Sequence, residues 1–241
     1  MPRISIKRFR AVVALLASLA SGTAANAAVL PLPETLGLTN GEQYQFVFVT
    51  NSTTFGSSAS LSTYNNFVQT AANNASIGTS VGLTWKAIVS VGSGSSNAAS
   101  NAPASATVKV YRIDGVQVAN GGTNPFYSGS ANHLAAINVT ELGTTVNRNV
   151  WTGGNANGSE SGSGLLGTAA NPIYGYSGGT LAANGDPNSW SRIGNIDSGN
   201  PYSLYALSGV LTAPEPSSLM VAGLMLTALA GRRRRRTEVA K

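Results

Sequence analysis

The chain has 241 residues, with 15 Lys and Arg against 9 Asp and Glu, a formal net charge of +6 and no cysteine. The lack of thiols excludes disulfide bonds, a thiolate nucleophile and a cysteine metal site. Ten of the 15 basic residues lie near the two ends, and the body between them has five basic and seven acidic residues, a formal charge of −2, which excludes the electrostatic footprint of a nucleic-acid-binding protein.

Residues 1–27 have the organisation of a secretory signal peptide. Four basic residues between Arg3 and Arg10 precede an apolar run from Ala11 to Ala20, and Ala25 and Ala27 supply the small-x-small pattern that signal peptidase cleaves. We therefore expect signal peptidase to process this chain and the mature protein to begin at Ala28. The alternative is an uncleaved N-terminal helix, against which the short apolar run and the cleavage pattern argue.

The body begins with a strand pattern and then changes to a helix pattern. The segment from Gln43 to Thr50 predicts a strand that is buried on both faces at its middle. Apolar residues at helical spacing then predict one amphipathic helix packed on a sheet, with Ser60 or Ser62 as its N-cap and Gly78 beyond its end. The apolar residues of this helix are Leu61, Tyr64, Phe67, Val68, Ala71 and Ala72.

A second strand and a hairpin follow the helix. Leu83 to Ser90 alternates with period two, which predicts a strand. Thr107 to Arg112 and Val116 to Ala119 flank an Asp114-Gly115 pair, which favours a tight hairpin turn.

The remainder of the body is rich in loops until its last strand. Asn120 to Gly199 contains only short apolar islands, whereas Pro201 to Leu211 predicts a strand. We expect this last strand to pair with the first and to bring the ends of the body together. These elements predict a single α+β domain over residues 28–212.

Catalytic and metal-binding patterns are weak. His133 is the single histidine, and its polar loop, which includes Ser130 and Asn132, predicts a surface residue rather than a general base. No sequence feature pairs two carboxylates for glycoside hydrolysis. Asn155 to Glu160 offers alternating oxygen ligands for Ca²⁺, but with one carboxylate it favours a solvated turn. We expect no catalytic residue, no metal and no cofactor.

Aromatic residues are the candidates for ligand contact, because an aromatic face packs well on the C–H surface of a sugar. The six residues weighed are Trp85, Trp151, Trp190, Tyr127, Tyr174 and Tyr176. Trp85 lies on the apolar face of its strand, which predicts a core position. Trp190 stands between two serines in the loop-rich region, so we expect it to be exposed and take it as the candidate ligand contact.

Residues 213–241 combine three features. Pro214 and Pro216 hold Glu215 extended, because proline fixes its own φ and disfavours a helical conformation in the residue before it. A nearly uncharged stretch from Leu219 to Gly231 follows, shorter than the roughly 20 apolar residues that span a bilayer. Five arginines, which favour the cytoplasmic side of a membrane, come next: Arg232, Arg233, Arg234, Arg235 and Arg236.

This tail resembles the PEP-CTERM sorting signal of Gram-negative bacteria. The resemblance implies recognition and cleavage by exosortase, a membrane protease-transpeptidase. The chain would be anchored in the inner membrane in transit and would then reach the cell surface or the extracellular matrix. The alternative is a permanent C-terminal anchor without processing.

The body also resembles bacterial extracellular domains similar to endostatin and the C-type-lectin-like fold. In that fold a helix and a pair of terminal strands support a long loop region that carries the binding surface. The chain has no cysteine near the last strand, where members of this group commonly have some, and so departs from the pattern there. The resemblance rests on Phe48-Val49-Thr50, Thr53-Thr54-Phe55, Trp85-Lys86-Ala87, Val110-Tyr111, Asp114-Gly115, Val118-Ala119, Val150-Trp151-Thr152-Gly153 and Ser203-Leu204-Tyr205-Ala206-Leu207.

The two resemblances imply an exported, non-enzymatic protein of the cell envelope or extracellular matrix, associated with exopolysaccharide. Its expected partners are signal peptidase and exosortase as processing enzymes, the membrane before processing, and polysaccharide; nucleic acid is not among them. Two alternatives stay open, a structural or adhesive module that binds other proteins and a secreted glycan-active enzyme.

Overall fold

The computed structural model describes residues 29–78, 82–92, 96–130 and 132–215. The predicted signal helix and signal-peptidase site, and the sorting segment from Pro216 onward, lie outside these residues. The elements in chain order are η1 (Pro33–Leu36), β1 (Gln43–Val49), β2 (Thr54–Phe55), α2 (Leu61–Asn74), β3 (Trp85–Ala87), α3 (Ala98–Asn101), β4 (Lys109–Arg112), β5 (Gln117–Ala119), β6 (Asn149–Trp151), β7 (Ile173–Tyr176), β8 (Gly194–Asn195), β9 (Pro201–Ser208) and β10 (Leu211–Thr212).

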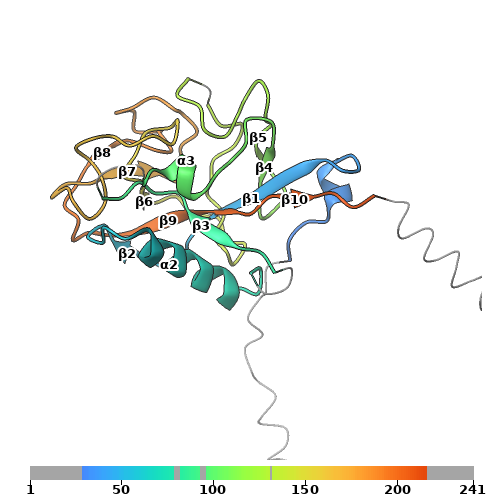
Figure 1. Ribbon diagram of the computed structural model, residues 1–241, viewed down its shortest axis with the longest axis horizontal. Helices are drawn as coiled ribbons and strands as arrows, with labels where there is room; N and C mark the ends of the chain where they lie inside the picture. Colours follow the sequence, from blue (N-terminus) through green and yellow to red (C-terminus); the bar gives the residue numbers. More distant parts are fainter. Residues whose placement is uncertain (1–28, 79–81, 93–95, 131, 216–241) are drawn as a thin grey trace, which may run out of the picture.

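One mixed sheet forms the centre of the molecule (Figure 1). Its main path runs β5-β4-β1-β9-β6-β7-β8, with β10 added to β1 and with β2 and β3 added to β9. β1 and β9 are antiparallel, with Val47 opposite Leu207, so the predicted pairing of the first and last strands is confirmed. The β1–β4 and β6–β9 pairs are parallel. A mixed sheet with few helices makes the fold α+β, as predicted.

The strands at the centre of the sheet are buried on both faces. In β1, Phe46 and Phe48 belong to one hydrophobic cluster and Val47 and Val49 to a second. Successive side chains of a strand point to opposite faces, so the two clusters lie on opposite sides of the sheet. Burial on both sides explains why the second half of β1, from Phe46 to Val49, is continuously apolar.

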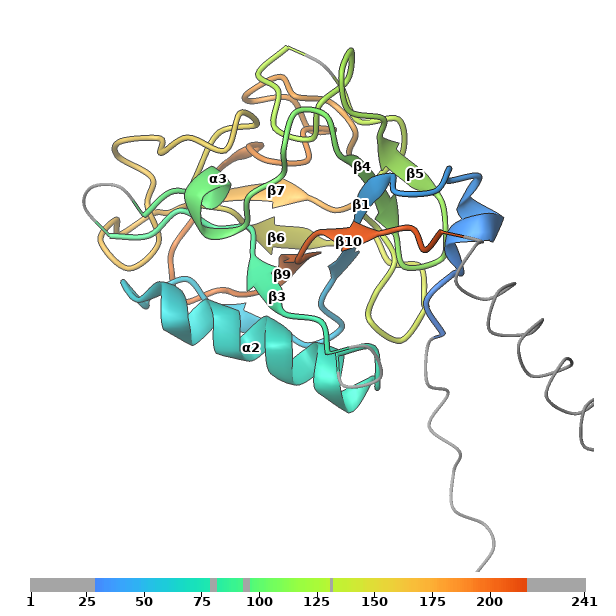
Figure 2. The same cartoon turned by 45° about the vertical axis from the view of Figure 1, so that its right-hand side comes forward.

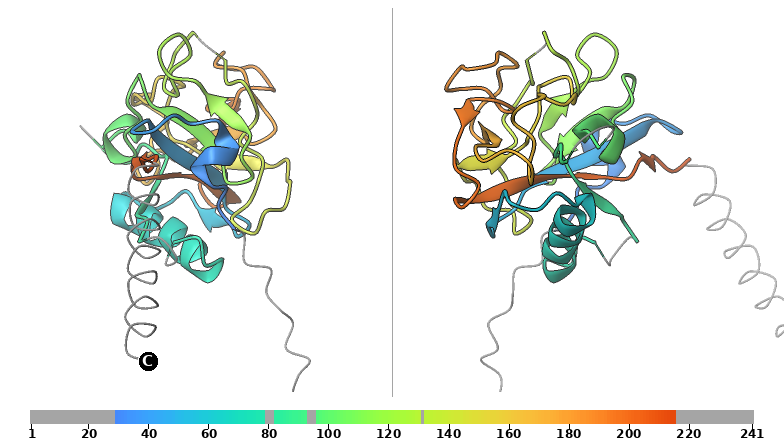
Figure 3. Two further views of the ribbon diagram at one scale, coloured as in Figure 1. Left: turned by 90° about the vertical axis from the view of Figure 1, so that its right-hand side faces the viewer. Right: turned by 60° about the vertical axis from the view of Figure 1, so that its left-hand side comes forward.

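The two faces have different covers. α2 packs along one face beside β3 and β9, and the loop-rich part of the chain, with α3, lies on the other (Figure 2). The right-hand view of Figure 3 looks along α2 and places the sheet between the helix and most of the loops. α2 therefore covers part of the first cluster, whereas irregular chain covers the second.

α2 confirms the predicted amphipathic helix and ends at Asn74, before Gly78 as expected. Ser60 occupies the N-cap position, but its side chain makes no capping hydrogen bond; its hydroxyl lies 2.8 Å from that of Ser62. The backbone N–H of Ala75 closes the last turn on the carbonyl of Ala71 at 3.1 Å.

The predicted strand over Leu83 to Ser90 is only partly correct. Regular pairing with β9 covers Trp85–Ala87, the segment called β3. The next residues stay buried but bond singly to different segments: Ile88 N–H donates to the carbonyl of Tyr205 at 3.0 Å and Ser90 N–H to that of Thr152 at 2.8 Å. Beyond Ala87 the chain thus loses its regular pairing with β9 and bonds to the loop that follows β6.

The predicted hairpin is confirmed as β4 and β5. Its turn contains Gly115 at φ 91, a backbone conformation that favours glycine. Arg112 stabilises the turn by donating from Nε and Nη2 to the two carboxylate oxygens of Asp114, at 3.0 and 2.6 Å.

Candidate functional site

α2 presents three different stripes of side chains. Its core stripe consists of Tyr64, Val68 and Ala72, all fully buried in the first cluster. Residues three and four apart share one helix face, so the positions between these core residues point to the flanks and the outside of the helix. One flank fixes the position of the helix, and the outside carries the candidate site.

On the flank facing β3, side-chain amides form the hydrogen bonds that a neighbouring strand would otherwise make. The Oδ1 of Asn65 accepts from Ala87 N–H at 2.9 Å, and the Oε1 of Gln69 accepts from Trp85 N–H at 2.7 Å. The Nδ2 of Asn101 donates to the carbonyl of Ala87 at 2.8 Å and to Asn65 Oδ1 at 2.9 Å. These amides satisfy the free edge of β3, whose other edge pairs with β9. They hold α2 in a single register on the sheet.

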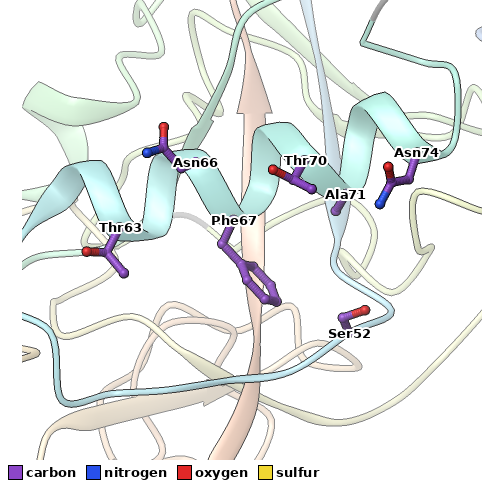
Figure 4. A pocket seen from close by; sticks show the side chains of 7 residues that line it. All are labelled: Ser52, Thr63, Asn66, Phe67, Thr70, Ala71 and Asn74. Atoms are coloured by element: carbon purple, nitrogen blue, oxygen red, sulfur yellow. The ribbon is translucent and has the colours of Figure 1, made fainter.

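The outer stripe borders a groove of about 310 Å³, at the lower end of the range for small-ligand sites. Figure 4 shows the ring of Phe67 projecting from the helix between Thr63 and Asn74, toward the loop that carries Ser52. Phe67 is half-buried and packs on the first cluster, so the core supports its ring from behind. The groove is lined by Ser52, Thr63, Asn66, Phe67, Thr70, Ala71 and Asn74.

The second wall of the groove is a loop that follows β1. The Thr50 hydroxyl donates to the carbonyl of Ser52 at 2.7 Å and accepts from Leu204 N–H at 2.9 Å, which ties the loop to β9. Asn51 is held from both sides: its N–H donates to Glu141 Oε2 at 2.8 Å and its carbonyl accepts from Arg148 Nη1 at 2.8 Å. The wall that carries Ser52 is therefore preorganised.

The composition of the groove limits what it can bind. Its lining contains one aromatic ring, three hydroxyls and two amides, with no charged or titratable group. Without a general acid, a general base or a nucleophile activated by one, such a lining has no means of acid–base catalysis. Amides and hydroxyls both donate and accept hydrogen bonds, and the ring offers an apolar face. This arrangement suits a neutral ligand with many hydroxyl groups.

The expected exposure of Trp190 is wrong. Its side chain is 1% exposed and lies in the second cluster. The Trp190 ring stacks on His133 at 4.5 Å between centroids, and His133 stacks on Phe126 at 4.9 Å. The N–H of Trp190 donates to the carbonyl of Leu181 at 3.1 Å, and the buried ring presents no platform to a ligand.

The predicted surface position of His133 is also wrong, since the side chain is 5% exposed. Its Nε2 lies 3.2 Å from the carbonyl of Phe126, which can only accept, so the neutral ring carries its proton on Nε2. Burial lowers the pKa of His133 from 6.5 to about 4, against the opposing effect of this hydrogen bond. The neighbouring Ser130 and Asn132 are exposed, and Asn132 Oδ1 accepts from Ala182 N–H at 3.0 Å.

The other aromatic candidates divide between core and surface. Trp85 is buried, as predicted, and so is Trp151, whose Nε1 donates to the carbonyl of Thr54 at 3.1 Å. Tyr127, Tyr174 and Tyr176 are half-buried. The hydroxyl of Tyr127 donates to the carbonyl of Ala102 at 2.8 Å, which fixes it against α3 rather than leaving it free for a ligand.

In the segment weighed for calcium, the side-chain oxygens of the two asparagines bond within the protein. Asn155 Oδ1 accepts from Arg192 Nη1 at 3.2 Å, and Asn157 Oδ1 accepts from the N–H and the hydroxyl of Ser159 at 3.0 and 2.7 Å. These bonds make the segment a closed turn, bridged between Gly154 and Glu160. Within the described ranges, no group of three or more His, Asp or Glu side chains is placed to hold a metal ion.

The described part of the sorting segment is short. Ala213 is buried and tied to the start of β1, donating to the carbonyl of Glu42 at 2.9 Å and accepting from Gly41 N–H at 3.0 Å. Pro214 and Glu215 follow directly and are exposed. In residues 29–215, outside the three internal gaps, no helix has the length and apolarity needed to cross a bilayer. Ala25, Ala27, Ala28, Pro216 and the five arginines lie outside the described residues.

The sequence alone does not identify the groove. It places Phe67 among the apolar residues of the helix and so assigns it to the core, whereas Phe67 lies at the edge of the core stripe and also faces the groove. A usable signal was the run of Asn and Thr at helical spacing around it, at Thr63, Asn66, Thr70 and Asn74. Ser52 joins them only through the fold.

The chain matches no known protein-family profile and no curated protein sequence. The sorting-signal and lectin-like resemblances therefore rest on the residues that carry them. The binding activity has to be argued from the geometry of the groove.

Proposed function

We propose that this chain is an exported, exosortase-sorted protein of the cell surface or extracellular matrix, with a non-enzymatic body that binds neutral polysaccharide. The signal-peptide pattern and the PEP-CTERM resemblance support the route. The observation that carries the binding activity is the uncharged groove of α2, where one supported ring lies among amides and hydroxyls.

We also propose that the body is a relative of the C-type-lectin-like and endostatin-like domains. The antiparallel pairing of β1 with β9, the helix on one face and the long loop-rich cover on the other support this assignment. The proposed ligand groove lies on the helix side, however, rather than in the loop region that carries the binding surface in that fold.

The order of the polar side chains along α2 favours an extended ligand. Thr63, Asn66, Thr70 and Asn74 follow one another at intervals of about one helical turn, with a rise of roughly 1.5 Å per residue. Polar groups repeat at a spacing similar to the length of a pyranose ring, so successive sugars of an unbranched polymer find equivalent partners. Phe67 then stacks on one ring near the middle.

Phe67→Ala tests the binding site, with Phe55→Ala as the matched control because Phe55 is 55% exposed and does not line the groove. Full-length protein in a sugar-free detergent is titrated calorimetrically with cello-, malto- and laminarihexaose and with the polyuronate alginate. We expect at least one neutral hexaose to bind, alginate to bind more weakly, and Phe67→Ala to weaken binding about tenfold or more, a typical loss for a stacking contact. Equal effects of the two substitutions, or no binding of any neutral hexaose, would refute the assignment.

The sorting route has its own test. Fractionation of the producing cells and sequencing of the termini should give an extracytoplasmic protein that begins at Ala28 and lacks the Arg232–Arg236 block. An intact chain in the cytoplasm contradicts this route.

The same titration distinguishes glycan binding from the alternative, an adhesive module that binds proteins. Such a module would bind other proteins through exposed apolar residues such as Phe55, and Phe67→Ala would not change its affinity for them.

A further inference from the structure

Glu141 is a buried carboxylate that forms no close ion pair with any of the described residues. It is 5% exposed and stands in a tight turn in which Gly143 N–H donates to the carbonyl of Thr140 at 2.8 Å. The segment before it lies along the end of β1, where Val49 N–H donates to the carbonyl of Val139 at 3.0 Å. This register brings Glu141 opposite Asn51, one residue before the groove residue Ser52.

The burial of Glu141 costs stability. Desolvation raises its pKa above 4.5, against the opposing effects of the Asn51 N–H, its own backbone N–H and the charge of Arg148. Among the described residues, Arg148 is the charged side chain whose field acts on this carboxylate, and the two do not form a close ion pair. A neutral side chain of similar size would avoid the cost of the buried charge.

The partner of Glu141 shows what the charge does. Its Oε2 accepts from Asn51 N–H at 2.8 Å, while Arg148 donates to the Asn51 carbonyl at 2.8 Å. Hydrogen bonds to ionised groups are about twice as strong as neutral ones. The peptide groups on both sides of Asn51 are therefore held by charged side chains. The neighbouring residue, Ser52, forms the loop wall of the groove.

We infer that Glu141 is a positioning residue of the α2 groove, which through Asn51 holds the Ser52 wall in the conformation that binds neutral glycan. This inference rests on the proposed function. Among the described residues, Glu141 forms no hydrogen bond to a lining residue of the groove, and it acts through the peptide group of Asn51, next to Ser52. Loss of its charge at acidic pH loosens the wall, so the affinity for glycan falls on acidification while the fold itself is not weakened at this site.

The test compares Glu141→Gln and Glu141→Ala with Glu34→Gln, which removes an exposed carboxylate in η1. Full-length protein is titrated with the tightest-binding neutral hexaose at pH 7.5 and pH 5, and amide hydrogen exchange is followed in peptides that cover residues 50–54 without ligand. Thermal unfolding is measured in parallel.

We expect Glu141→Ala to weaken binding about tenfold, as the loss of one charge-assisted hydrogen bond would, and to accelerate exchange at Asn51. Glu141→Gln keeps an acceptor and loses less, about threefold, with an equal or higher Tm. The wild type binds more weakly at pH 5 than at pH 7.5, and Glu141→Gln removes this pH dependence. If Glu141 had only a structural role, its substitution would lower Tm and would leave the pH dependence of glycan binding unchanged.

Unchanged exchange at residues 50–54 in Glu141→Ala overturns the inference, as does a pH profile that survives Glu141→Gln. If the wild type binds no neutral hexaose, the proposed function fails, and the exchange data still decide whether Glu141 positions the loop.

Discussion

The two faces of the sheet are closed in opposite ways. On one side α2 contributes a narrow stripe of core residues and leaves its outer surface to a groove, while on the other an irregular cover draws its own large rings inward. His133 and Trp190 belong to that second cover, and both are buried. A regular helix buries one face and keeps another for a ligand, whereas loops without regular structure need their aromatic residues as a core.

Among the substitutions that test this difference between the two faces, Trp190→Ala should have the largest effect. Removing a fully buried tryptophan should lower the free energy of unfolding by about 3–5 kcal/mol. Urea denaturation followed by circular dichroism measures the loss, with Phe55→Ala expected to change the stability by no more than about 0.5 kcal/mol. Folded Trp190→Ala protein should still bind neutral glycan as the wild type does. A loss of stability below about 1 kcal/mol, or a loss of glycan binding without a loss of stability, would contradict the buried position of Trp190.

Acid should weaken the loop-covered face through His133. The pKa of this ring is lowered from 6.5 to about 4 in the folded protein. The unfolded chain takes up a proton below about pH 6.5 and the folded protein only near pH 4, so the contribution to stability is complete above pH 6.5 and falls by about 3 kcal/mol across this window.

His133→Phe is the control for that titration, because it keeps a ring in the stack but removes the titrating nitrogen. The unfolding free energy of the wild type minus that of the variant should fall by about 3 kcal/mol as the pH falls from 6.5 to 4. A difference that stays constant with pH would mean that His133 is not buried as a neutral ring.

The helix-covered face depends instead on the side-chain amides that bond to β3. Asn65→Ala leaves Ala87 N–H without its acceptor and should cost about 1–3 kcal/mol. Asn66→Ala, one residue further along the helix and in the groove lining, should be nearly neutral for stability and should weaken glycan binding. Urea titration and calorimetry of both variants measure this reciprocal pattern, and equal effects on stability would contradict it.

Phe67→Leu sharpens the division between packing and binding on the same helix. The leucine keeps most of the apolar contact with the first cluster, so the loss of stability should stay below about 1.5 kcal/mol. The flat ring is lost, so glycan affinity should fall nearly as much as in Phe67→Ala. If leucine preserves the affinity, Phe67 contributes packing alone.

Regular elements were predictable from the sequence because their periods are local. The apolar run of β1, the helical spacing of α2 and the Asp114-Gly115 turn each lie within a few residues, and all three predictions are confirmed. The pairing of β1 with β9 was also predictable, since two strand-like apolar segments fall at the two ends of the body.

The burial of residues in the loops was not predictable. Trp190 and His133 have polar neighbours in sequence, and only contacts with distant segments bury them, as when Leu134 N–H donates to the carbonyl of Val118 beside His133. The groove has the same origin. Ser52 meets the helix because Glu141 and Arg148, about 90 and 97 residues away along the chain, hold the loop between them.

The most direct test of the central claim is hydrogen exchange of the full-length protein with and without a saturating neutral hexaose. The α2 groove predicts slower exchange in peptides covering residues 50–54 and 61–74, and little change in residues 120–196. Protection confined to residues 120–196, with α2 unaffected, would contradict the assignment and place the ligand on the opposite face of the sheet.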